Sequence, residues 1–316
     1  SDVYKRQENI LIITLGKFKG IINEQIPELP KENLLLEPYA RRTAPCIAYA
    51  TYTLLKRNPD AVMAATPADI IVNDEQLFKE TMTNALDYAE KNPVLVTLGV
   101  KPDRPDTEYG YIQAVGGKGA CSSGDPVKVK TFTEKPDAEI ADVFFRSGEF
   151  FWNSGIFVWQ ASVIKEEMER YIPEITRLFD GWEGALGSPA EEVFIERAYT
   201  DCIKLSIDYG VMEKTDRAWV YPIQFGWSDI DSWENYYSSI RRKDQDGNIS
   251  NTQMKILQND KRNIILTKNK NKLLMIRGLE DCLVVDTDDV LLICPRDDKQ
   301  YKELVNSTRM PGYDKY

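Results

Sequence analysis

The stretch Leu34–Arg57, LLLEPYARRTAPCIAYATYTLLKR, changes its periodicity partway along and so indicates the fold class. Leu34–Leu36 is the short apolar run typical of a buried strand. From Thr43 to Arg57 the apolar residues recur at helical spacing, with Thr43 as the expected N-cap and Pro45 in the first turn, where proline is tolerated. A strand followed closely by a helix is a building unit of α/β folds.

The alternation continues on both sides of this stretch. Asn9–Thr14, Ala61–Ala65 and Val94–Val100 read as strands, and a helix capped by Asn73 or Asp74 separates the last two. Later strands are expected at 111–114, 127–134 and 151–159, with Gly116–Pro126 as a hairpin loop, and helices at 137–146 and 162–171. We therefore predict an α/β, Rossmann-like fold with a mixed, mostly parallel sheet.

Composition also divides the chain. Residues 241–254 are polar and turn-rich and are interpreted as a linker. Residues 8–240 would then form the main domain and 255–316 a small β-rich C-terminal domain.

The chain has 316 residues and no histidine, which excludes several mechanisms. Ser-His-Asp and Cys-His nucleophile systems, an imidazole base and histidine-ligated zinc or haem are all ruled out. The five cysteines contain no C-x-x-C pair, which fits a reducing compartment better than a disulfide framework. Any acid–base or metal chemistry must use carboxylates, Lys, Arg and backbone groups.

The net charge of −10 argues against sequence-independent nucleic-acid binding. The sequence contains no apolar run long enough to span a membrane and no secretory signal, so we expect a cytoplasmic protein with neither nucleic acid nor membrane as a partner.

The N-terminus does not look like a natural start. Residues 2–7 (DVYKRQ) can be back-translated as GATGTGTATAAGAGACAG, which resembles the end of a transposase adaptor used in sequencing libraries. We therefore interpret residues 1–7 as an adaptor-derived artefact; the alternative is an ordinary disordered tail.

Several polar segments stand at expected strand ends or in turns, where α/β proteins place ligand contacts. Each alone has a structural explanation, because Asp69 could cap the next element, Glu134-Lys135 could be a solvated turn and Asn153 could satisfy backbone groups. The ordered set carries more information. It comprises LLLEPYARRTAPCIAYA (34–50), TPAD (66–69), TEYGYI (107–112), TFTEKPD (131–137), FWNSGIFVW (151–159), SIDYGVMEKT (206–215) and GWSDIDSW (226–233).

This order resembles the sugar-nucleotide pyrophosphorylases, and among them the mannose-1-phosphate guanylyltransferases. The resemblance implies attack of a sugar-1-phosphate oxygen on the α-phosphate of GTP, giving GDP-mannose and pyrophosphate. It implies GTP and mannose-1-phosphate as partners, leaves a homodimer open, and requires Mg²⁺ or another divalent cation, held by Asp69 and Asp229.

The resemblance also implies roles for individual residues. Lys135 would hold the sugar phosphate, and Glu134 and Asn153 would bind sugar hydroxyls beside the close-approach residue Gly110. Glu37 would select guanine, with Arg41, Thr43 and Ala44 lining the nucleotide pocket. In this pattern Arg42 stands where the family usually has Asn. Asp208 belongs to a family motif but receives no role.

One family element is missing from the sequence. No segment matches the G-G-x-G-x-R loop that follows the family's first strand and grips the triphosphate. We therefore expect an N-terminally truncated, inactive form. The alternatives are a pyrophosphorylase for another sugar or base, or a non-catalytic sugar-nucleotide-binding relative.

Overall fold

The computed structural model describes residues 7–117, 125–230, 232–296 and 301–307. The chain divides into two compact units, which are described separately. Unit 1 contains residues up to Pro67 together with Asp74–Phe225, and unit 2 contains Ala68–Asn73 together with the residues from Gly226 onward. Residues 1–6 of the adaptor-like start and 118–124 of the expected hairpin loop lie outside the described parts. The domain boundaries inferred from composition stay predictions.

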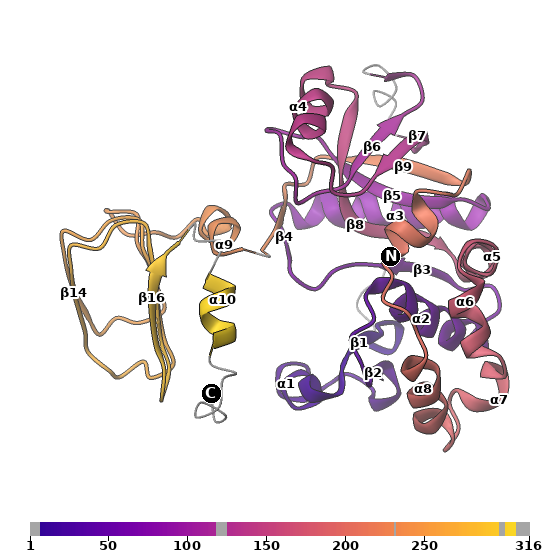
Figure 1. The fold of residues 1–316 in the computed structure, drawn as a ribbon, viewed down its shortest axis with the longest axis horizontal. Helices are drawn as coiled ribbons and strands as arrows, with labels where there is room; N and C mark the ends of the chain where they lie inside the picture. Colours follow the sequence, from indigo (N-terminus) through magenta and orange to yellow (C-terminus); the bar gives the residue numbers. More distant parts are fainter. Residues whose placement is uncertain (1–6, 118–124, 231, 297–300, 308–316) are drawn as a thin grey trace. The chain divides into compact units, whose positions relative to one another are not determined.

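Unit 1 is built on a mixed six-stranded sheet with the order β3-β8-β5-β9-β7-β6 (Figure 1). A separate pair of parallel strands, β1 and β2, completes its strands. Their bounds are β1 Ile12–Leu15, β2 Leu34–Glu37, β3 Val62–Ala65, β5 Leu95–Val100, β6 Tyr111–Ala114, β7 Val127–Thr133, β8 Phe150–Gln160 and β9 Ala218–Ile223.

The prediction of a mostly parallel sheet is wrong. In the six-stranded sheet only β5 and β9 pair in parallel, whereas β8 is antiparallel to β3, β5 and β6, and β7 is antiparallel to β6 and β9. An apolar run identifies a buried strand but carries no information about its direction. The assumption that every strand–helix–strand unit is parallel therefore failed where β8 enters between β3 and β5.

The helices expected at 43–57, after Asn73 or Asp74, at 137–146 and at 162–171 are present close to these positions, whereas the helix at Lys19–Gln25 was not predicted. Asp74 caps α3 by accepting a hydrogen bond from the Leu77 N–H, and Gly148 ends α4 in the left-handed conformation. The helices are α1 Lys19–Gln25, α2 Thr43–Arg57, α3 Glu75–Lys91, α4 Ala138–Ser147, α5 Ala161–Tyr171, α6 Pro173–Thr176, α7 Trp182–Ala185 and α8 Glu191–Thr200, with a π-helical turn at Asp208–Met212.

The N-cap prediction for Thr43 is wrong. Arg42 occupies that position with a φ of 67° and no side-chain capping bond. The Thr43 hydroxyl instead accepts a hydrogen bond from the Ile207 N–H at 2.9 Å. A residue far away in sequence thus takes the oxygen that local reasoning had assigned to the helix end.

The core of unit 1 joins the sheet to a group of helices. Side chains from α2, α5, α6 and α8 pack with alternate residues of the central strands, such as Leu95 and Trp159. Figure 1 shows α2 and α5–α8 gathered together. The first five residues of β5 are all buried, as expected for a strand covered on both faces.

Unit 2 is β-rich. Its parallel strands stack through side-chain amides: Asn248 Oδ1 accepts from the Asn263 N–H, and Asn263 Oδ1 accepts from the Cys282 N–H. The elements are β4 Ile70–Val72, β10 Trp227–Asp229, α9 Trp233–Ser239, β11 Ile249–Ser250, β12 Lys255–Gln258, β13 Ile264–Thr267, β14 Leu274–Arg277, β15 Cys282–Asp286, β16 Leu291–Pro295 and α10 Tyr301–Asn306. Among the described residues, no helix has both the length and the apolar content needed to cross a membrane.

Candidate functional site

Unit 1 brings together several of the residues predicted to bind the sugar phosphate. Asn153 lies in β8, and its backbone N–H donates to the Gly110 carbonyl at 2.8 Å. The Asn153 side chain contacts Asp208, at the start of the π-helical turn, through an Nδ2–Oδ1 hydrogen bond of 2.9 Å. Residues from separate motifs therefore meet at one place. We call Gly110, Glu134, Asn153 and Asp208 together the Asn153 cluster.

Within this cluster, the absence of a side chain on Gly110 permits the close approach of Glu134. A Cβ atom on Gly110 would lie 2.4 Å from Glu134 Oε2 and 3.3 Å from Asn153 Cβ. The first separation is far shorter than any ordinary contact, so a Cβ at this position would displace the Glu134 carboxylate, whereas Asn153 would have to move by only a few tenths of an ångström. The close approach found at Gly110 is that of Glu134, and an approach of the sugar to Gly110 stays a prediction.

The Glu134 carboxylate is unusual in its electrostatics. Its Oε2 atom is buried and accepts no hydrogen bond from the described residues. Desolvation, reinforced by the negative charge of Asp208, raises the pKa of Glu134 from 4.5 to about 7, although Lys135 acts in the opposite direction. A buried acceptor without an internal partner is costly, and a ligand donor would satisfy it.

The backbone around Glu134 is held from the segment that follows Asp208. The Glu134 N–H donates to Glu213 Oε1 at 2.8 Å, and the Tyr209 hydroxyl donates to the Glu134 carbonyl at 3.3 Å. The next residue, Lys135, has a φ of 44° and an exposed side chain. Two fixed backbone bonds and a turn conformation therefore present Lys135 to solvent beside the carboxylate.

Glu37, predicted to select guanine, lies at the end of β2 with a half-buried side chain. Burial raises the pKa of its carboxyl, and the nearby Tyr199 hydroxyl partly opposes that shift. Within the described residues neither Glu37 Oε1 nor the Tyr199 hydroxyl completes a well-aligned hydrogen bond. Burial also raises the pKa of the Cys46 thiol to about 12, so that neighbouring thiol is neutral.

The loop that follows Glu37 is tied to the segment before Asp208. The Arg41 guanidinium donates to the Tyr199 and Thr200 carbonyls, both at 3.0 Å, at the C-terminal end of α8. Ala44 is fully buried, and its N–H donates to the Leu205 carbonyl. Arg41, Thr43 and Ala44 thus hold the loop in place, and their contact with a nucleotide stays a prediction.

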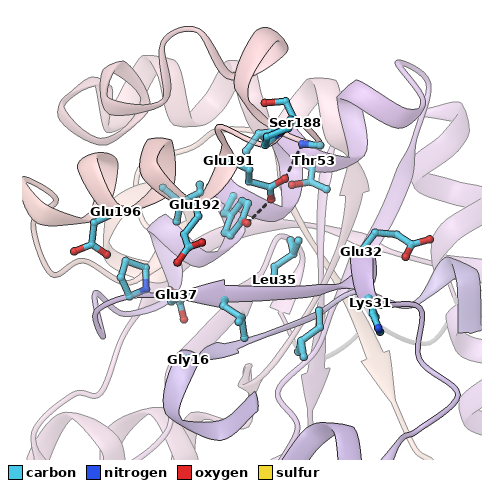
Figure 2. A pocket seen from close by; sticks show the side chains of 18 of the residues that line it. Gly16, Lys31, Glu32, Leu35, Glu37, Thr53, Ser188, Glu191, Glu192 and Glu196 are labelled. Carbon is cyan, nitrogen blue, oxygen red and sulfur yellow. Dashed lines mark hydrogen bonds between the residues drawn. The ribbon is translucent and has the colours of Figure 1, made fainter. Parts of the chain in front are cut away.

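A pocket of about 780 Å³ lies along β2 and includes Glu37 in its lining (Figure 2). Its lining also includes Thr53 of α2, whose buried hydroxyl has no hydrogen-bond partner in the described structure. Figure 2 shows Glu191, Glu192 and Glu196 of α8 along another part of the lining. Among the described residues around this pocket, none is Glu134, Lys135 or Asn153, so the pocket and the Asn153 cluster are different places.

The predicted metal ligands belong to unit 2. Asp69 and Asp229 lie where β4 and β10 pair: Asp229 stands opposite Ile70, and the Ile230 N–H donates to the Asp69 carbonyl at 2.9 Å. The described residues contain no cluster of three or more potential metal-ligating side chains. Mg²⁺ takes few protein ligands and retains several waters, and the role of Asp69 and Asp229 as its ligands stays a prediction.

Sequence reasoning missed the residues that support the cluster. Thr97 donates from Oγ1 to Asn153 Oδ1 at 3.1 Å, and Tyr209 and Glu213 hold Glu134. Thr97 sits in an apolar strand and gave no signal. Asp208, Tyr209 and Glu213 belong to the motif SIDYGVMEKT, but no spacing rule connects this motif to Asn153.

Residues 3–246 match the nucleotidyl transferase family, and the chain belongs to it.

Individual curated proteins are also similar to the chain. The chain is 35% identical over 318 residues to a mannose-1-phosphate guanylyltransferase of Escherichia coli K12, with 96% of this chain and 64% of that protein covered. It is 33% identical to the alginate biosynthesis protein AlgA of Pseudomonas putida, with 98% and 63% covered. The chain therefore spans about 64% of the length of such relatives.

A solved structure agrees with this comparison. The fold is similar to a crystal structure from Thermus thermophilus that is titled mannose-1-phosphate geranyltransferase, with a TM-score of 0.80 and 25% identity. That match covers 96% of this chain and 85% of the solved one.

Proposed function

We propose that this protein takes part in the transfer of GMP from GTP to mannose-1-phosphate, giving GDP-mannose and pyrophosphate. The observation that carries the proposal is that Glu134 Oε2, a buried acceptor with no hydrogen-bond partner among the described residues, lies over Gly110 and beside Asn153. A sugar bearing hydroxyl groups supplies the donor that this acceptor lacks. The relationship to guanylyltransferases supports mannose-1-phosphate as that sugar.

The reaction needs positioning and charge neutralisation more than acid–base chemistry. A phosphate oxygen of mannose-1-phosphate attacks the α-phosphorus of GTP, the bond between the α-phosphorus and the bridging oxygen breaks, and pyrophosphate leaves. Lys135 would hold the sugar phosphate as a point charge beside Glu134. Asp69 and Asp229 would bind Mg²⁺, which neutralises phosphate charge when bound.

Glu37 is our candidate for guanine recognition. Guanine presents its N1–H and N2–H₂ groups on one edge, and one carboxylate can accept hydrogen bonds from both. The raised pKa of Glu37, and the absence of a well-aligned donor to its Oε1 atom among the described residues, fit a carboxyl group that gains donors from a ligand.

We expect the 316-residue chain to bind mannose-1-phosphate but to form little GDP-mannose, because its sequence contains no G-G-x-G-x-R phosphate loop. Isothermal titration calorimetry with mannose-1-phosphate tests binding, and an assay with GTP, mannose-1-phosphate and Mg²⁺ tests turnover. Asp69→Asn and Asp229→Asn should each weaken the Mg²⁺ dependence of GTP binding. Failure to bind mannose-1-phosphate, or equal affinity for unrelated sugar phosphates, would contradict the proposal.

A further inference from the structure

One short segment, residues 205–213, contacts both the Glu37–Ala44 loop and the Asn153 cluster. At its beginning, the Leu205 N–H donates to the Arg41 carbonyl and the Leu205 carbonyl accepts from the Ala44 N–H. Further along, Asp208, Tyr209 and Glu213 contact Asn153 or Glu134. The middle of the segment is a π-helical turn, a rare conformation that is frequent at functional sites.

The orientation of the Asn153 amide is fixed by its neighbours. The Gly155 N–H, which can only donate, points to Asn153 Oδ1 at 3.2 Å and so identifies that atom as the oxygen. Thr97 Oγ1 donates to the same oxygen at 3.1 Å. The oxygen therefore already accepts two hydrogen bonds.

The nitrogen of the amide, unlike the oxygen, still has bonding capacity. One Nδ2 hydrogen is donated to Asp208 Oδ1 at 2.9 Å, and an amide nitrogen carries two hydrogens. With its oxygen occupied, Asn153 can offer a ligand only the second hydrogen. This makes Asn153 a donor of a single hydrogen bond, suited to a hydroxyl or phosphate oxygen.

We propose that Asp208 is a positioning residue that holds the Asn153 amide in this orientation, so that its remaining hydrogen is directed at an oxygen of the sugar phosphate. The proposal rests on the proposed function for the identity of the ligand. The orientation of the amide itself rests only on the contacts of Thr97, Gly155 and Asp208.

Three variants separate positioning from general structural support. Asp208→Asn keeps an oxygen that can accept from Asn153, so mannose-1-phosphate affinity should stay within about threefold of the parent. Asp208→Ala removes the acceptor and should weaken binding about tenfold. In the exchanged pair, Asn153→Asp with Asp208→Asn, the amide at position 208 would donate to the carboxylate at position 153, which restores the bond with donor and acceptor exchanged. The carboxylate at position 153 has no hydrogen to offer the ligand. The exchanged pair should retain the parent melting temperature within about 2 °C and still bind at least about thirtyfold more weakly.

A readout without ligand keeps the two proposals distinguishable. In ¹⁵N-labelled protein the Asn153 side-chain amide should exchange slowly with solvent in the parent and in Asp208→Asn, and at least about tenfold faster in Asp208→Ala. If the parent fails to bind mannose-1-phosphate, the proposed function falls, while the exchange rates still decide the positioning role. Unchanged exchange in Asp208→Ala, or full binding by the exchanged pair, would overturn the positioning role.

Discussion

The Asn153 cluster and the Glu37–Ala44 loop were predicted as two halves of one site, and they are built differently. Around Asn153, backbone and side-chain bonds hold the polar groups but leave Glu134 Oε2 and one amide hydrogen available. In the loop, Arg41, Thr43 and Ala44 use their polar groups on residues 199–207. Buried polar groups with spare bonding capacity are suited to ligand binding, whereas the bonds made by Arg41, Thr43 and Ala44 support the loop.

The largest effect should follow from filling the space at Gly110. Gly110→Ala places a Cβ within 2.4 Å of Glu134 Oε2, so we expect mannose-1-phosphate affinity to fall at least about 100-fold. The matched control is Gly184→Ala in α7, where a Cβ would meet nothing within 4 Å. Calorimetric titration measures the mannose-1-phosphate affinity of both variants. Equal affinities in Gly110→Ala and Gly184→Ala would show that the Asn153 cluster is not part of the binding site.

The second prediction concerns Glu134 and pH. Because the pKa rises from 4.5 to about 7 in the folded state, the parent protein should lose stability as pH increases between those values and no further above them. Glu134→Gln should therefore be more stable than the parent at pH 8, by on the order of 1–3 kcal/mol, and nearly equal to it at pH 4.

Thermal unfolding of both proteins across this pH range measures the effect. Glu192→Gln, an exposed position on α8, serves as the control and should show little difference at any pH. A parallel pH dependence in the parent and in Glu134→Gln would mean that Glu134 is not the group responsible.

Substitutions in the Glu37–Ala44 loop should change the stability of the protein more than its affinity for mannose-1-phosphate. Arg41→Ala removes the donors to the Tyr199 and Thr200 carbonyls and should destabilise unit 1 by about 1–2 kcal/mol. Mannose-1-phosphate affinity should remain within about twofold of the parent. Arg42→Ala is the neighbouring control, and a large loss of sugar affinity in Arg41→Ala alone would show that the two halves are coupled.

The smallest effect should come from the backbone at Arg42. Its φ of 67° and ψ of −168° lie in a region that only glycine adopts readily. Arg42→Gly should therefore stabilise the protein by about 1 kcal/mol relative to Arg42→Ala, which keeps the strain. Thermal unfolding of the two variants provides the comparison, and identical melting temperatures would argue against strain at this position.

The sequence predicted the elements of unit 1 well where the signal was local. The bounds of α2 and the Asp74 cap of α3 agree with the periodicity and capping pattern. The prediction of strand direction in the sheet failed because β8 inserts between β3 and β5, through contacts between residues remote in sequence. The candidate ligand residues were found through motif order, but Thr97 and the Asp208 contact could not be, since both depend on three-dimensional proximity.

The most direct test of the account is a titration of the ¹⁵N-labelled chain with mannose-1-phosphate, followed by NMR. We predict saturable shifts of the Glu134 and Gly155 backbone amides and of the Asn153 side-chain amide, with no change at Leu266, which packs against the core of unit 2. Absence of saturable shifts, or shifts confined to Leu35 and Thr53 beside the β2 pocket, would contradict the placement of the sugar phosphate at Asn153.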